Sequence, residues 1–272
     1  MTTTQSDFSG SIPAIYDACL GPIFAEFAYD LGERVAAILG EVGQVLEVAC
    51  GTGISTRLVR AHLPPHVGMV ATDLNPAMIE FAVEERGGLP GVRYEIEDAL
   101  NLSFSAKSFD AVICQFGIMF FPDIAKGLAE MLRVLRPGGL VACSVWDSLA
   151  ANPAAASAHE TIGRYFDSDP PTFLEVPFGS CPPEPTLELF RAQGFEQMHA
   201  QPVEIRVAHP SALELARGFI EGNPGIREIR ERAKAPTEEI VEALATELEQ
   251  HFGPDPLQIP MRAFVFTGHA PA

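Results

Sequence analysis

The chain has 272 residues, 47% of them hydrophobic, so it can bury a sizeable core in one large domain or in a core with a smaller cap. Its 36 acidic residues outnumber 18 Lys and Arg, which gives a net charge of −18. Binding to a phosphate backbone or an anionic membrane surface needs clustered cations, so we expect neither a nucleic acid nor a membrane among its partners.

The spacing of the cysteines and histidines predicts neither disulfides nor a metal site. Five cysteines are widely spaced without a Cys-x-x-Cys pair, which is typical of buried thiols in a reducing compartment. His62 and His66 are four apart, but Pro64 and Pro65 prevent a continuous helix between them, so we expect no metal site. The N-terminus lacks a basic region, and no apolar run approaches the length of a membrane helix, about 18 residues. We therefore expect a soluble, cytoplasmic protein.

The first predicted element is a helix. Apolar residues at helical spacing run through residues 12–39, and Gly40 and Gly43 end the pattern. We expect Tyr16 to sit before this helix, where its ring either covers a pocket or serves only in packing.

Strands then alternate with helices. Five strands are predicted, at residues 44–49, 67–72, 92–96, 109–114 and 140–145. Helices are predicted at residues 54–63, from Pro76 (with Asn75 as N-cap) to Gly87-Gly88, and at residues 123–135. This alternation predicts a parallel, doubly wound sheet.

The pattern changes after Trp146. Residues 148–185 are rich in Ala, Pro, Ser and aromatics without a clear period, which suits either a cap over a pocket or a long connection. Three helices and a final strand are predicted beyond them: a helix at residues 186–193, one opened by the capping box of Ser211 and Glu214, one at 237–252, and the strand at 262–267.

One stretch, residues 45–57, reads as a strand, a small-residue loop and a helix start. Gly51 and Gly53 allow a ligand to lie against the main chain. A dinucleotide-binding loop has a third glycine at the position that Thr56 occupies in this chain. Glu47 ends the strand with a negative charge, which suits an ammonium group better than a phosphate.

Two further acids follow at strand ends. Asp73 ends the second strand, in position for two ribose hydroxyls, and Leu74 offers an apolar face to a base. Asp98 ends the third strand, in position for an exocyclic amine, and Ala99 leaves room for a ring. A ligand with an amino acid end, a ribose and an adenine but no phosphate suits all three acids, and S-adenosylmethionine is such a ligand.

These motifs resemble those of the class I S-adenosylmethionine-dependent methyltransferases, particularly the small-molecule branch typified by the ubiquinone/menaquinone methyltransferases. The resemblance covers roughly residues 10–147 and is diffuse beyond them. It is carried by residues 47–53, 73–78, 97–99, 102–104, 108–110 and 135–139. Ala49 departs from a pattern that often has glycine, and we expect cofactor binding to survive this change. Residues 12–32 are similar to the N-terminal cover helix of such enzymes.

The resemblance implies a set of cofactor-binding residues. The loop backbone at Ala49, Cys50, Gly51 and Gly53 would hold the methionine part, with Glu47 near its ammonium group. The other implied contacts are Asp73 on the ribose, Leu74, Asn75 and Met78 on the ribose and adenine side, Asp98 and Ala99 on the adenine, Gln115 at the methyl end, and Tyr16 as a cover.

The implied fold is α/β: a doubly wound, mostly parallel seven-stranded sheet of Rossmann-like type with its last strand antiparallel, and a helical cap. Residues 1–147 would form the cover helix and the cofactor-binding core. Residues 148–272 would form the cap or substrate region and complete the sheet within the same domain.

The implied function is methyl transfer from S-adenosylmethionine to a small apolar or aromatic molecule by in-line displacement. No catalytic residue is identified; His159 is the base to test first, although a lone histidine there is often incidental. The aromatic residues of the region after Trp146 suggest an apolar or aromatic acceptor; they are Tyr165, Phe166, Phe173 and Phe178.

Two other functions stay open. Asp73 lies 20 positions after Gly53, which also suits the ribose acid of an NAD(P)-dependent oxidoreductase. A non-catalytic S-adenosylmethionine-binding protein is the third hypothesis. The sequence names neither the acceptor nor the methylated atom, and it leaves a homodimer open.

Overall fold

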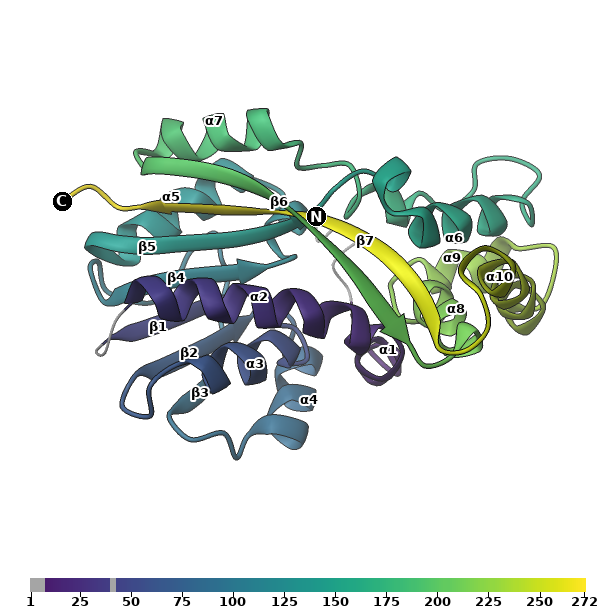
Figure 1. Cartoon of the computed structure of the whole chain (residues 1–272), viewed down its shortest axis with the longest axis horizontal. Helices are drawn as coiled ribbons and strands as arrows, with labels where there is room; N and C mark the ends of the chain where they lie inside the picture. Colours follow the sequence, from purple (N-terminus) through teal and green to yellow (C-terminus); the bar gives the residue numbers. More distant parts are fainter. Residues whose placement is uncertain (1–7, 40–42) are drawn as a thin grey trace.

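A seven-stranded sheet forms the centre of the computed structural model, which describes residues 8–39 and 43–272 (Figure 1). Its strand order is β3-β2-β1-β4-β5-β7-β6. The strands are β1 (Gln44–Val48), β2 (Gly68–Asp73), β3 (Val92–Ile96), β4 (Phe109–Gln115), β5 (Leu135–Trp146), β6 (Glu196–His209) and β7 (Leu257–His269). In this order, the five neighbouring strands β3, β2, β1, β4 and β5 pair in parallel. Strand β7 runs antiparallel to both β5 and β6. The predicted fold class is confirmed.

Helices cover both faces of the sheet, as a parallel sheet requires. On one face, α2 (Gly21–Leu39) packs against α3 (Ile54–His62), and on the other α5 (Ile124–Val134) packs against α7 (Pro183–Gln193) (Figure 1). The α2–α3 crossing is close, because a Cβ on Gly32 would lie 2.7 Å from His62 Nδ1. Because helices cover both faces, the central strands bury apolar runs such as that of β4. Each large apolar side chain buried in this way contributes about 1.5–3 kcal/mol to stability.

The first helical run differs from its prediction at Tyr16. The run consists of α1 (Ile12–Ile15), a π-helical turn η2 (Tyr16–Leu20) and α2. Tyr16 therefore lies inside the run rather than before it. Pro22 has no amide hydrogen, so α-helical bonding is interrupted here and the wider turn accommodates the break. Gly40, predicted to end the helix, lies outside the described residues.

Two predicted helix starts are confirmed in atomic detail. Asn75 caps α4 (Pro76–Arg86) by accepting from Ala77 N–H at 3.0 Å. Ser211 caps α8 (Ala212–Glu221) by accepting from Glu214 N–H at 3.3 Å. Each cap satisfies a backbone donor that the helix itself leaves unpaired.

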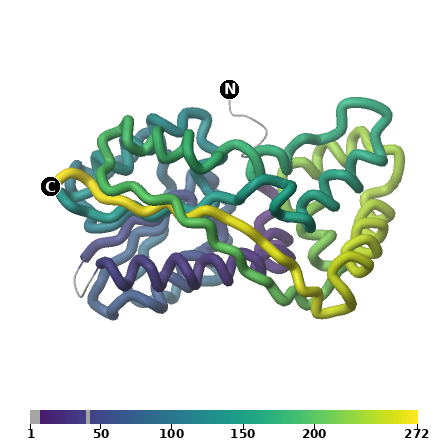
Figure 2. Tube along the Cα trace, turned by 45° about the horizontal axis from the view of Figure 1, so that its top comes forward, coloured from purple at the N-terminus to yellow at the C-terminus, as the bar shows by residue number. Residues whose placement is uncertain are grey.

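Strand β6 was not predicted from the sequence. Its fourteen residues carry no clean apolar alternation and include Pro202, which an edge strand tolerates. Its pairing with β7 along nearly its whole length, rather than its own pattern, makes it a strand. The two strands continue past the sheet as a long curved ribbon (Figure 2).

A helical group lies at the far end of this ribbon (Figure 2). It contains α8 with α6 (Pro153–Gly163), α9 (Ile226–Arg232) and α10 (Thr237–Phe252), of which α6 and α9 were not predicted. Three 3₁₀ turns join other segments: η3 (Ile118–Phe120), η4 (Leu149–Ala151) and η5 (Phe173–Glu175). One apolar core runs from the sheet into this group. Across residues 8–39 and 43–272, no helix has both the length and the apolar character to cross a membrane.

Candidate active site

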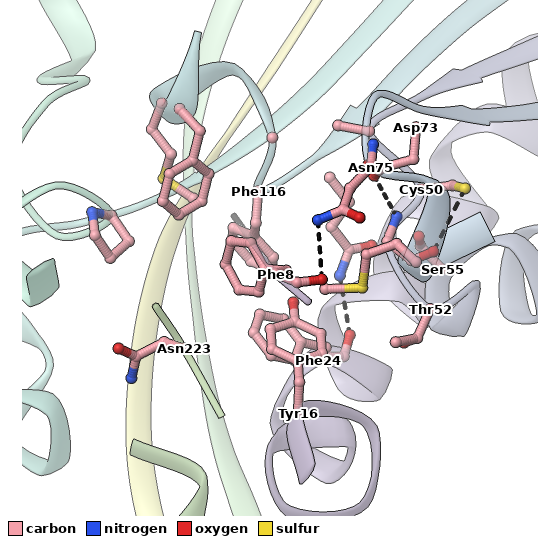
Figure 3. A pocket seen from close by; sticks show the side chains of 18 of the residues that line it. Phe8, Tyr16, Phe24, Cys50, Thr52, Ser55, Asp73, Asn75, Phe116 and Asn223 are labelled. Atoms are coloured by element: carbon pink, nitrogen blue, oxygen red, sulfur yellow. Dashed lines mark hydrogen bonds between the residues drawn. The ribbon is translucent and has the colours of Figure 1, made fainter. Parts of the chain in front are cut away.

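A cavity of about 450 Å³ lies where the carboxyl ends of β1, β2 and β4 meet the helical group (Figure 3). Strand order reverses here, because β1 has β2 on one side and β4 on the other. Open α/β sheets bind ligands at such a switch point, beyond the carboxyl ends of the strands. The cavity is therefore the candidate active site.

The loop after β1, residues 49–53, forms one wall of the cavity; we call it the glycine loop. Ala49 (φ +56°), Gly51 (φ +56°) and Gly53 (φ +82°) all have left-handed backbone. This conformation costs a residue with a Cβ about 1–2 kcal/mol, so Ala49 is strained where the two glycines are not. Gly117 lies opposite, where an added Cβ would come within 2.5 Å of Ala49 Cβ. The glycine loop thus depends on a small residue at position 117.

Asp73 ties the glycine loop to the end of β2. Its Oδ2 accepts from Gly51 N–H and its Oδ1 from Asn75 N–H, both at 2.9 Å. Burial raises the pKa of Asp73, while these backbone donors act to lower it. Each carboxylate oxygen keeps a further lone pair, and Asp73 lines the cavity, so it can still accept hydrogen bonds from a ligand.

Residues 8–20, the cover segment, are held over the cavity by hydrogen bonds that include those of Asn75 and Arg86. Asn75 Nδ2 donates to Phe8 O at 2.9 Å (Figure 3). Arg86 donates to Thr52 O at 2.8 Å and to both carboxylate oxygens of Asp17 at 2.8 and 3.0 Å. Arg86 thereby joins the cover segment to the glycine loop from outside the cavity.

Replacing Arg86 by methionine should lower affinity for a ligand of this cavity by about 1–2 kcal/mol, roughly 5- to 30-fold, because the cover segment and the glycine loop lose their shared partner. Titration with S-adenosylhomocysteine, the product form of the cofactor that the sequence predicts, measures the change. Arg93→Met is the control, since Arg93 is 70% exposed and pairs only with Glu95 on its own strand. Equal effects of the two substitutions would contradict the role of Arg86.

Glu47 lies behind the glycine loop and does not line the cavity. It is fully buried, and its carboxylate accepts from the hydroxyls of Ser55 and Thr56, the latter at 2.6 Å. Burial raises the pKa of Glu47 to about 7. The side chain thus holds the start of α3 against β1. Its predicted contact with a cofactor ammonium group is not part of this arrangement and stays a prediction.

Glu47 should make stability depend on pH. Because its pKa in the folded protein is about 7, against an ordinary 4.5, the folded protein keeps a proton that the unfolded chain has released. This contribution, up to about 3 kcal/mol, is complete below pH 4.5 and is lost as pH rises through 7. Urea unfolding of the wild type and of Glu47→Gln between pH 5 and pH 8 should show the variant gaining relative stability with rising pH. A pH-independent difference would contradict the assignment.

Most of the predicted cofactor residues meet at the cavity wall. Those that line it are Tyr16, Ala49, Cys50, Gly51, Asp73, Leu74, Asn75, Met78, Asp98, Ala99 and Gln115. Gly53 does not; a Cβ there would lie 3.1 Å from Arg86 Cδ and 3.2 Å from Tyr94 Oη, so Gly53 faces α4 and β3. Its backbone forms the N-cap of α3, and its predicted contact with the cofactor stays a prediction.

Gln115 presents an unsatisfied acceptor at the end of β4. Its Nε2 donates to Phe24 O at 3.0 Å, and since a carbonyl can only accept, this bond fixes the orientation of the amide. Gln115 is 8% exposed, and its Oε1 has no hydrogen-bond partner among the described residues. A buried acceptor without a partner costs about 1–3 kcal/mol. A ligand with a donor near this atom would remove that cost.

The other half of the cavity is aromatic. Phe116 stacks on Trp146 with ring centroids 3.8 Å apart, and Phe120 stacks on Phe173 at 6.0 Å. The rings of this half, which we call the aromatic chamber, are Phe8, Phe116, Phe120, Trp146, Phe173 and Phe178. The chamber also has lining residues from the second half of the chain that the sequence did not indicate: Leu174, Pro177, Phe219, Asn223 and Met261.

His159 is not at the cavity, which overturns its choice as the first base to test. It lies on α6, and its Nε2 is 3.5 Å from Glu175 Oε1. Tyr165 and Phe166 are also absent from the lining, and Phe166 lies under the guanidinium of Arg232. The sequence could not indicate these placements, because α6 itself was not recognised.

Residues 45–139 match the family model described as a methyltransferase domain. Curated relatives match a similar length: the demethylmenaquinone methyltransferase of Deinococcus radiodurans is 43% identical over 97 residues (35% of this chain and 40% of the relative). The enzyme of the same name from Staphylococcus aureus (strain JH9) is 36% identical over 100 residues (37% and 42%). The chain thus spans about two fifths of the length of these relatives.

Solved structures share the fold over most of the chain. The [4+2]-cyclase SpnF matches with a TM-score of 0.57 and 21% identity. The match covers 91% of this chain and 82% of the SpnF chain. A phosphoethanolamine N-methyltransferase of Haemonchus contortus, solved with S-adenosylhomocysteine, has a TM-score of 0.57 and 17% identity (97% and 61%).

The fold is the one that the sequence motifs predict, and residues 45–139 are the segment that matches a methyltransferase domain. The family match supports S-adenosylmethionine as the cofactor. The aromatic chamber is built largely by residues outside the matched segment, so the relatives do not define the acceptor.

Proposed function

We propose that this protein transfers a methyl group from S-adenosylmethionine to a small apolar or aromatic molecule. The observation that carries the proposal is one cavity with two different halves. The glycine loop and the strand-end acids form a polar half, and the aromatic chamber opens directly from it. A polar nucleoside and an apolar acceptor can therefore lie end to end in the same space.

The residues of the polar half suit the three parts of the cofactor. Asp73 would accept from the ribose hydroxyls, with Leu74 and Met78 beside the ring system. Asp98 and Ala99 would meet the adenine at the mouth of the cavity. The orphan oxygen of Gln115 offers an acceptor to the methionine end, and the bare backbone of Gly51 allows close approach. Tyr16 would cover the group from the π-helical turn.

The protein's part in the reaction is positioning and exclusion of water. S-adenosylmethionine would supply the methyl group and the sulfur that takes the electron pair. The aromatic chamber holds the acceptor in a dry space, which favours a transition state whose positive charge is spread out. Alignment of the reacting groups can supply several kcal/mol, about 7–11 in the best intramolecular models. The absence of a histidine from the described lining is compatible with this mechanism, because positioning carries most of it.

A mass spectrum of small molecules released from the purified protein tests the proposal. Co-purified S-adenosylmethionine or S-adenosylhomocysteine is the expected result. A thermal-shift comparison supplies the second readout: stabilisation by S-adenosylhomocysteine supports the proposal, whereas stabilisation by NAD(H) alone contradicts it.

The oxidoreductase alternative gains no support. Thr56 takes the place of the third glycine of a dinucleotide loop, and its hydroxyl is bonded to the buried Glu47. The non-catalytic alternative deserves one experiment, because a fold of this type also occurs in a [4+2]-cyclase. Tight cofactor binding without methyl transfer to phenol, amine and carbon-acid acceptors would favour it.

A further inference from the structure

The cavity carries acids but no basic side chain. Its described lining contains three carboxylates, those of Asp73, Glu97 and Asp98, and no Lys, Arg or His. The sequence of residues 1–7 and 40–42 contains none of these three types either. In the aromatic chamber, a carboxylate or phosphate on the acceptor would lose its hydration without gaining a cationic side chain in return, which is costly. The acceptor class that suits this cavity is therefore uncharged or cationic.

Among the residues that the structure describes, the aromatic chamber also lacks a general base. The carboxylates of Asp73 and Asp98 accept from backbone N–H groups, and that of Glu97 accepts from Ser103, all at the polar half. Burial raises the pKa of the Tyr16 hydroxyl, which therefore stays protonated. Phenols and carbon acids need a base of suitable pKa to become nucleophiles. An uncharged nitrogen needs none, because its lone pair is already available.

The rings of the aromatic chamber suit the cation that such a nitrogen becomes. Phe116 and Trp146 stack on each other and are buried, whereas Phe120 and Phe173 stack on each other and are only partly buried, so the outer faces of the latter two rings are the ones that a cation can approach. Aromatic faces attract ammonium groups, more strongly where water is excluded. The protein's net charge of −18 adds a favourable long-range field for a cation.

We infer that the acceptor is an apolar amine and that the protein methylates its uncharged nitrogen. The inference rests on the proposed function and adds the acceptor class to it. As the nitrogen–carbon bond forms, the sulfur–methyl bond breaks and its electron pair stays on sulfur. The nitrogen carries the positive charge and gives up its proton to water after release, so no protein base takes part.

Four bicyclic acceptors of similar size test the inference: 1,2,3,4-tetrahydroisoquinoline, 2-naphthol, 2-tetralone and 2-naphthoate. Each is incubated with the full-length protein and S-adenosylmethionine labelled in its methyl group, and products are identified by mass spectrometry. Methyl transfer to the amine alone is expected. Its kcat/KM should rise about tenfold per pH unit below the pKa of the amine, because only the free base reacts. Above that pKa, kcat/KM should reach a plateau. With a less basic amine, this plateau should begin at that amine's own lower pKa.

The outcomes separate this inference from the proposed function. Failure of S-adenosylhomocysteine to bind would overturn the proposed function. Binding followed by transfer to 2-naphthol, 2-tetralone or 2-naphthoate rather than to the amine would overturn the inference alone. Binding with transfer to none of the four would overturn the inference and would also favour the non-catalytic alternative to the proposed function. A pH plateau that stays fixed when the amine is changed would also overturn it, since that plateau would report a base on the protein.

A matched pair of variants tests the contact with the aromatic chamber. Phe173→Leu should lower kcat/KM for the amine about fivefold through loss of a cation–ring contact, and should leave affinity for S-adenosylhomocysteine unchanged. Phe166→Leu is the control, because Phe166 lies outside the cavity. An unchanged kcat/KM for Phe173→Leu, or equal losses in both variants, would contradict a contact between this ring and the charged nitrogen.

Discussion

Replacing Asp73 by alanine should weaken binding of S-adenosylhomocysteine by about 1.5–3 kcal/mol, roughly 10- to 150-fold. The carboxylate is the acceptor predicted for the ribose hydroxyls, and it also holds the glycine loop through Gly51 N–H. Both losses act in the same direction. Isothermal titration measures the affinity, and circular dichroism verifies that the variant keeps its fold.

Asp123→Ala is the matched control for Asp73→Ala. Asp123 caps α5 by accepting from Lys126 N–H at 2.9 Å and does not line the cavity. Its removal should cost about 1 kcal/mol of stability without changing affinity for S-adenosylhomocysteine. An unchanged affinity in Asp73→Ala would show that the ribose assignment is wrong.

Replacing Gly117 by alanine should destabilise the protein by about 1–3 kcal/mol and loosen the glycine loop. The added Cβ would lie 2.5 Å from Ala49 Cβ and 2.7 Å from Cys114 Sγ, so the loop or β4 must shift. Adding Ala49→Gly should recover part of the loss, because it removes the first of these clashes and relieves the left-handed backbone at position 49. Urea unfolding of the single and double variants measures these changes.

The double variant decides whether the Ala49–Gly117 contact is the cause. If the contact matters, the double variant should be more stable than the sum of the two separate effects predicts. Strict additivity would contradict the clash. The result also bears on the departure of Ala49 from the usual glycine, since Gly117 is what leaves room for its Cβ in this chain.

The sequence predicts the sheet well where local pattern and tertiary role agree. Strands at 92–96 and 109–114 lie within one residue of β3 and β4, because buried parallel strands read as short apolar or alternating runs between turn residues. The cap at Asn75 was also recognisable, because capping is a local hydrogen bond.

The remaining elements depend on distant partners. Strand β6 is defined by its pairing with β7, whose partner residues lie 48 to 73 positions away in the sequence, and its own residues alternate too poorly to reveal it. The short helix α9 carries too few apolar residues for a periodic signal. For α6, the Asn152-Pro153 start was present in the sequence, but the following alanines show little contrast between faces.

The candidate site divides in the same way. Asp73 and Asp98 were recognisable because Asp73 ends β2 and Asp98 lies two residues after β3, at the same edge of the sheet. Phe219 and Asn223 were not, because the ribbon of β6 and β7 and the helical group bring them to the cavity. Glu47 shows the limit of reasoning from position, since an acid at a strand end can turn inward to bond Ser55 and Thr56 instead of facing a ligand.

Titration of the full-length protein with S-adenosylhomocysteine by isothermal calorimetry is the most direct test of the central claim, that the cavity takes the methyl donor. Saturable binding of one molecule per chain is predicted, with no comparable binding of NAD(H). A folded protein that gives no binding heat at high micromolar ligand, or that binds NAD(H) in its place, would contradict the claim.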